Sequence, residues 1–138
     1  MDASIIILFA IVIVLGVVMF ALITFSKRGG KLDVDKYRVN WLAIEQSLVK
    51  GEEATYHLAI LNADKLVDQA LRDRGYGGQT MGDRIKSTRG QLSHRNDLWT
   101  AHKLRNRIAH ETGVRVSYDQ TRRALSGFKH TLKDLGAI

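Results

Sequence analysis

The chain has 138 residues, enough for one domain and an appendage, and it contains no cysteine and no proline. Disulfide bonds and thiol catalysis are therefore excluded. Lysine and arginine number 21 against 14 aspartates and glutamates, so the formal net charge is +7 and anionic partners are favoured.

The first predicted element is an uninterrupted apolar segment from Ala3 to Phe25 without a charged side chain. About 20 apolar residues suffice to cross a bilayer as a helix, so we predict a transmembrane anchor over residues 1–26. A secretory signal peptide would have a basic start, a shorter apolar region and a cleavage site of small residues. This segment instead has Asp2 at its start, which favours an anchor on the membrane over a cleaved signal.

A short basic hinge over residues 27–34 follows, with Lys27, Arg28 and Lys31 close to the apolar segment. Cytoplasmic flanks of membrane helices are rich in lysine and arginine. We therefore expect a single-pass protein with its N-terminus outside and a cytoplasmic helical domain over residues 35–138. The positive charge of this domain has two interpretations, attraction to anionic lipid headgroups and binding of nucleic acid.

Helical spacing of apolar residues continues through the rest of the chain. A first helix is expected to end near Val49 and to be capped by Asp33 or Asp35, and a second is expected over residues 52–74. Gly75 ends this second helix, because glycine adopts the left-handed cap conformation at little cost. The pattern predicts an all-α fold, an antiparallel helical bundle behind the single transmembrane helix.

Two sequences of the capping-box type predict the starts of further helices. Residues 80–83 predict a short helix through about Ser87, and residues 117–120 predict a closing helix that ends near Leu135. Between them, we expect a helix over residues 96–111. No strand pattern competes with these assignments.

The helix expected over residues 96–111 contains Arg105, Asn106 and, four positions after Asn106, His110. A guanidinium is always cationic, and an imidazole exchanges protons near neutral pH. Phosphodiester cleavage needs both kinds of group. The sequence therefore points to a site for phosphodiester chemistry on this helix.

The segment from Leu104 to Glu111, in a helical setting from about residue 36 to 136, resembles the signature of HEPN domains. These are small all-helical modules found in ribonucleases and nucleotide-binding proteins. The resemblance implies a catalytic set of Arg105, Asn106 and His110, and a homodimer in which the two motif helices face each other. It is specific only at the motif itself.

The expected chemistry needs neither a metal nor another cofactor. His110 would remove a proton from a ribose 2′-hydroxyl or protonate the leaving oxygen, and Arg105 would stabilise charge on the phosphorane. Asn106 would orient His110 or contact phosphate. Attack by a 2′-hydroxyl requires RNA, for which His102, Lys103 and Arg107 are the expected binding residues.

Histidine spacing along the chain predicts no metal site. His102 and His110 are about 12 Å apart along a helix, too far for both to hold one ion without other ligands. His57, His94 and His130 have no ligand spacing, and we expect them to be ordinary surface residues.

Two faces of the motif helix are expected from its periodicity. Leu104 and Ile108 should face the core, whereas Trp99 and His102 fall on an opposite, polar arc. A tryptophan on this arc indicates a partner surface or cover from another element. An alternative function therefore stays open, a non-catalytic domain that recruits an unknown protein partner to the membrane.

Overall fold

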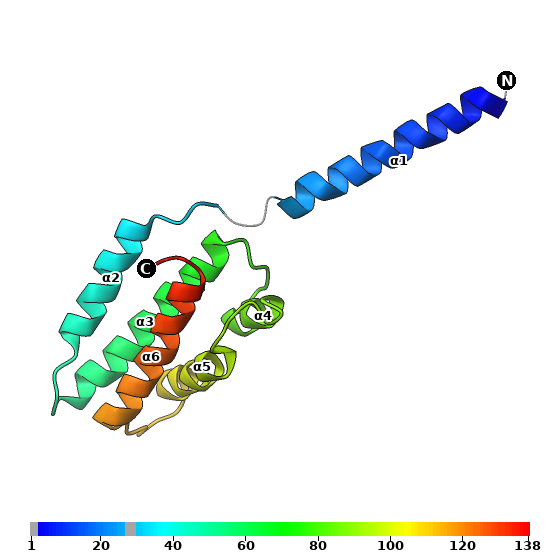
Figure 1. Ribbon diagram of the computed structural model, residues 1–138. Helices are drawn as coiled ribbons and strands as arrows, with labels where there is room; N and C mark the ends of the chain where they lie inside the picture. The colour runs from blue at the N-terminus through cyan, green and yellow to red at the C-terminus, as the bar shows by residue number, and fades with distance from the viewer. Residues whose placement is uncertain (1–2, 27–29) are drawn as a thin grey trace.

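The computed structural model describes residues 3–26 and 30–138, and all regular secondary structure in these ranges is α-helical (Figure 1). The six helices are α1 (Ala3–Ser26), α2 (Val34–Ser47), α3 (Glu53–Asp73), α4 (Met81–Ser87), α5 (Arg95–His110) and α6 (Tyr118–Asp134). The predicted all-α class is thus confirmed. Lys27 and Arg28 of the predicted basic hinge lie outside the described residues.

Helix α1 is long and apolar enough over Ala3–Ile23 to cross a membrane, by length and composition alone. A signal sequence near an N-terminus meets the same criterion. Helix α1 packs against none of the other described helices and points away from them in Figure 1. Its apolar side chains are exposed in the protein alone, as expected for a helix whose partner is lipid.

Helix α3 lies at the centre of the bundle and contacts α2, α4, α5 and α6. Its buried stripe is built mainly of small and aliphatic residues: Ala59, Ile60, Ala63, Val67, Ala70 and Leu71. Small residues permit close helix packing, and Phe128 and Leu132 of α6 complete the core from the opposite side. Helices α3 and α6 accordingly lie side by side (Figure 1).

Local signals set the ends of most helices. Asp33 caps α2 by accepting a hydrogen bond from the Lys36 amide, and both predicted capping boxes are present at α4 and α6. Gly75 ends α3 at a φ of 82°, where a residue with a side chain would be strained. Helix α5 begins at Arg95, one residue before the expected start at residue 96, and His94 occupies its cap position.

Candidate functional site

The three residues of the predicted catalytic set line one groove. Arg105, Asn106 and His110 all lie along its α5 wall, and α3 and α4 form the remaining walls. The groove has a volume of about 880 Å³ and is open to solvent. His102 and Lys103, two of the expected RNA-binding residues, line it as well. The fold therefore brings five of the six predicted site residues to one surface.

A closed ring of four side chains forms the floor of this groove. Oδ1 of Asp64, on α3, lies 2.7 Å from Nδ1 of His102, and Oδ2 of Asp64 lies 3.2 Å from Nε of Arg105. Nε2 of His102 is 3.2 Å from the amide nitrogen of Asn106, and Arg105 donates from Nη1 to Oδ1 of Asn106 at 3.1 Å. Each member of the ring thus contacts two others.

The donors of Arg105 determine the proton positions around this ring. A guanidinium has no acceptor atom, so the Asn106 atom that faces it must be the amide oxygen. The amide nitrogen of Asn106 then donates to Nε2 of His102. Nε2 is consequently an acceptor, and the ring proton of His102 sits on Nδ1, where Asp64 accepts it. Three hydrogen bonds of the ring are consistent with this single arrangement, and Nε of Arg105 faces Asp64 as an ion pair without a hydrogen bond.

The orientation of Asn106 corrects one expectation about its role. Its amide is engaged by Arg105 and His102, so it has no hydrogen bond to His110. Asn106 instead fixes the guanidinium of Arg105, which Asp64 holds from the other side.

His102 was expected on the polar arc of the motif helix, and it lies there beside the groove, but the structure buries it. The residue is buried, with 8% of its surface exposed, because Asp64 provides a charged partner inside the bundle. Trp99 of the same arc is half-buried, and Gly82 of α4 lies close to its ring: a Cβ at Gly82 would be 3.5 Å from Cη2. Trp99 is thus covered by another element of its own chain.

His110 is the exposed member of the predicted catalytic set. It ends α5 and lines the groove one helical turn beyond Asn106. No hydrogen bond or ion pair ties its imidazole to another described residue. The ring is therefore accessible to a bound substrate, whereas His102 already uses both of its nitrogens.

Arg107 is the predicted site residue that the fold separates from the others. It lies on a different cavity, between α5 and α6, and pairs with Glu111 at 3.4 Å. A helix turns by about 100° per residue, so two residues after Arg105 the side chain points away from the groove. Its expected contact with RNA stays a prediction.

The groove is basic, with five lysines and arginines against two aspartates. Asp68 is shared by Arg84, at 2.7 Å, and Arg72, at 2.6 Å. Lys65 and Lys103 are exposed and have no carboxylate partner within the described ranges. These two lysines give the groove positive charge that is free to attract an anion.

Sequence reasoning missed Asp64, the residue that organises the ring. Its signal was present as a single acid within the otherwise small and aliphatic stripe of α3. A carboxylate is buried only with partners, so its position on that stripe indicates a cationic or donor group on a facing helix. Which helix supplies the partners is fixed only by the tertiary structure.

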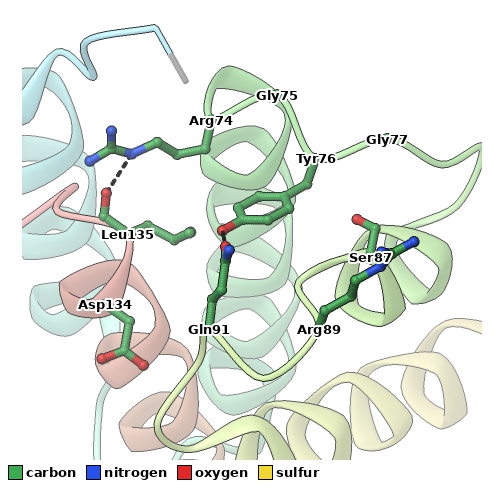
Figure 2. A pocket seen from close by; sticks show the side chains of 9 residues that line it. All are labelled: Arg74, Gly75, Tyr76, Gly77, Ser87, Arg89, Gln91, Asp134 and Leu135. Carbon is green, nitrogen blue, oxygen red and sulfur yellow. Dashed lines mark hydrogen bonds between the residues drawn. The ribbon is translucent and has the colours of Figure 1, made fainter. Parts of the chain in front are cut away.

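A second cavity, of about 320 Å³, lies between the end of α3, the loop after α4 and the end of α6 (Figure 2). Arg74 donates from Nε to the backbone oxygen of Leu135 at 2.7 Å, and Tyr76 contacts Gln91. Figure 2 shows Arg89 and Asp134 on opposite sides of this cavity. None of the predicted catalytic residues reaches it.

Sequence spacing treated His94 and His130 as unrelated, but the fold stacks their rings with centroids 4.2 Å apart. With Asp97 they form a group of three potential metal ligands.

In comparisons with family models, with curated proteins and with solved structures, the chain has no match.

Proposed function

We propose that the helical domain acts on RNA at the groove between α3, α4 and α5, as a metal-independent endoribonuclease of HEPN-like type. One observation carries this proposal: Asp64 and Asn106 fix the Arg105 guanidinium on the same groove wall that presents the exposed His110. A positioned cation beside an accessible imidazole is an arrangement suited to phosphodiester cleavage.

The reaction proceeds by transfer within the RNA strand. His110 removes the proton of a ribose 2′-hydroxyl, and the 2′-oxygen attacks the neighbouring phosphorus. The bond from phosphorus to the 5′-oxygen breaks, and this oxygen takes up the proton that His110 carries. The products are a 2′,3′-cyclic phosphate and a 5′-hydroxyl end, so atoms balance without water or metal.

Arg105 stabilises the phosphorane through the part of its guanidinium that the ring leaves open. Nε faces Asp64 and Nη1 donates to Asn106, whereas Nη2 has no partner in the described part of the chain. A third of the Arg105 side-chain surface is exposed. The guanidinium is thus held in place before substrate binds and needs little reorganisation during the reaction.

Lys65 and Lys103 bind the flanking phosphates in this proposal. Both lie on the groove without an acidic partner, so their charge is available to the RNA backbone. Their contribution depends on salt, because binding releases counterions from the nucleic acid. Binding should therefore weaken steeply as ionic strength rises.

The anchor and the assembly belong to the proposal as well. Helix α1 would span the membrane, with the domain on the cytoplasmic side, where RNA is present. A homodimer through α5 would place two copies of His110 near each other, as in the family that the motif resembles. Helix α4 covers part of the Trp99 ring, so only its remaining surface is open to a second copy.

The proposal is tested by an RNA cleavage assay with the full-length chain in detergent micelles and an excess of chelator. We expect cleavage that leaves 2′,3′-cyclic phosphate ends. His110→Ala and Arg105→Ala should each lower the rate by about 100-fold, the scale of lost proton transfer or lost charge stabilisation. Single-stranded DNA of the same sequence should remain intact.

His57→Ala is the matched control, since His57 lies on α3 outside the groove. Its rate should equal that of the unaltered protein, and circular dichroism should show the same helicity for all variants. Equal cleavage by the unaltered protein and both site variants would refute the site. If the unaltered protein binds RNA but does not cleave it, the domain is an RNA-binding module. If the unaltered protein neither binds nor cleaves RNA, a role in RNA metabolism is refuted.

The second candidate is a membrane-tethered interaction domain without catalysis. Val39 and Leu42 on the outer side of α2 favour it, because they are 68% and 52% exposed in this structure. Adjacent exposed aliphatic residues are a feature of protein contact surfaces. Absence of any effect on RNA, with partner binding lost in Val39→Asp, would support this alternative.

A further inference from the structure

Three potential metal ligands from two helices meet where α5 begins and α6 crosses it. A ring nitrogen of His94, a ring nitrogen of His130 and a carboxylate oxygen of Asp97 lie within 4.8 Å of one another. We propose that this cluster binds a divalent transition-metal ion of the zinc class. None of its members lines the groove of the proposed ribonuclease site, so the two proposals are independent.

Gly127 explains why these residues meet. A Cβ at this position of α6 would lie 3.0 Å from the backbone oxygen of Asp97 and 3.3 Å from its Cβ. Because glycine has no side chain, α6 can touch the first turn of α5. His130 follows Gly127 by about one turn and therefore reaches His94 and Asp97, which share one face of α5.

The hydrogen bonds behind His94 leave its Nε2 atom able to bind a metal. Asp134 accepts from the backbone nitrogen and from the hydroxyl of Ser93, both at 2.8 Å. The hydroxyl has only one proton, so its oxygen accepts from Nδ1 of His94, 2.8 Å away. With the ring proton on Nδ1, the lone pair is on Nε2. Carboxylate-linked histidines of this kind are typical of metal sites.

His130 provides a second, independent observation. Its Nδ1 atom is buried and has no hydrogen-bond partner among the described residues. Buried polar atoms are almost always paired, because an unpaired one loses its hydration without compensation. Coordination of a metal ion by this nitrogen would supply the missing partner.

The donor set identifies the class of ion. Two imidazoles and one carboxylate, with a position left for water, suit zinc and its neighbours in the first transition row and disfavour magnesium and calcium. Neighbouring ligands of tetrahedral zinc are about 3.4 Å apart, so no pair of donor atoms needs to approach by more than about 1.4 Å. Because the rings of His94 and His130 are stacked, binding requires the exposed His94 and Asp97 side chains to turn toward the ion.

Electrostatics at this place also permit a cation. The beginning of α5 carries the positive end of a helix dipole, which by itself disfavours a metal ion. Asp97 lies in that first turn, and Asp134 lies behind His94. Two carboxylates outweigh a dipole equivalent to about half a charge.

The test is a titration of the full-length chain, in detergent micelles and without a polyhistidine tag, with Zn²⁺ and with Co²⁺. We expect one ion per chain by calorimetry and the visible absorption of tetrahedral cobalt. His94→Ala and His130→Ala should each weaken binding by tenfold or more, and Ser93→Ala by about tenfold through loss of the support for His94. His57→Ala should bind like the unaltered protein.

Circular dichroism must show equal helicity for the variants. If His130→Ala unfolds, Asp97→Asn replaces it, since that change keeps the shape of an exposed side chain and should also weaken binding. Failure of the unaltered chain to bind either ion would overturn the proposal. So would binding that persists in the ligand variants, or that falls equally in His57→Ala. RNA cleavage in chelator is unaffected by any of these outcomes.

Discussion

At the scale of single residues, the candidate site depends on a carboxylate that takes no part in the proposed chemistry. Asp64 accepts from His102 and faces Arg105, so it holds both the buried imidazole and the half-buried guanidinium. Asn106 closes the ring, because its amide oxygen accepts from Arg105 and its amide nitrogen donates to His102. The position of Arg105 is therefore a consequence of the packing of α3 against α5.

Replacing Asp64 should destabilise the fold more than any exposed acid. Asp64→Ala leaves the His102 N–H buried without a partner and Arg105 without its counter-charge, and we expect a loss of about 3 kcal/mol. Urea unfolding of the full-length chain, followed at 222 nm for helicity, measures this loss. Asp119→Ala, an exposed acid in the first turn of α6, is the control and should change stability by less than about 1 kcal/mol. Equal losses in both variants would contradict a structural role of the ring.

At the scale of elements, α5 shows how far the sequence could be interpreted. Its helical nature and the packing of Leu104 and Ile108 against the core were predictable from periodicity. The burial of His102 was not, because a periodic pattern marks apolar faces and cannot show that Asp64 supplies a partner from α3. The same limit applied to His94 and His130, which only the crossing of two helices at Gly127 brings together.

Helix α4, which covers part of Trp99, starts with a capping box. The stabilisation that this capping box gives to the native state should weaken at low pH. The Thr80 hydroxyl and amide both hydrogen-bond to Asp83, at 2.9 and 3.2 Å, and these bonds hold the pKa of the Asp83 carboxyl below its ordinary value. A group whose pKa is lowered by folding stabilises the native state above its unfolded pKa. That contribution is lost as the pH falls through the lowered, folded-state pKa.

Nuclear magnetic resonance titration of the Asp83 carboxyl tests this expectation. Thr80→Ala should raise the pKa toward the value of a free aspartate, whereas Thr80→Ser keeps a hydroxyl and should preserve the lowered pKa. An unchanged pKa in Thr80→Ala would show that the Thr80 hydroxyl does not cause the shift.

At the scale of the whole molecule, the chain combines an apolar helix, which packs against none of the other described helices, and a basic helical bundle. If α1 is a retained anchor, intact-mass analysis of the protein from membranes should show the complete N-terminus. A reporter after Ile138 should then behave as cytoplasmic, because the basic residues that follow α1 resist translocation. A shortened N-terminus, or a reporter on the outer side, would contradict the proposed topology and make an RNA substrate untenable.

The proposed ribonuclease activity is tested most directly by chemical rescue of His110→Ala with free imidazole. If His110 transfers the proton, the variant should cleave RNA about 100-fold more slowly than the unaltered protein, and added imidazole should restore part of the rate in proportion to its concentration. Arg105→Ala should show no such recovery, because it lacks a charge and not a base. Cleavage by His110→Ala at the unaltered rate, or a loss that imidazole relieves equally in both variants, would contradict the assignment of His110 as the proton-transfer group.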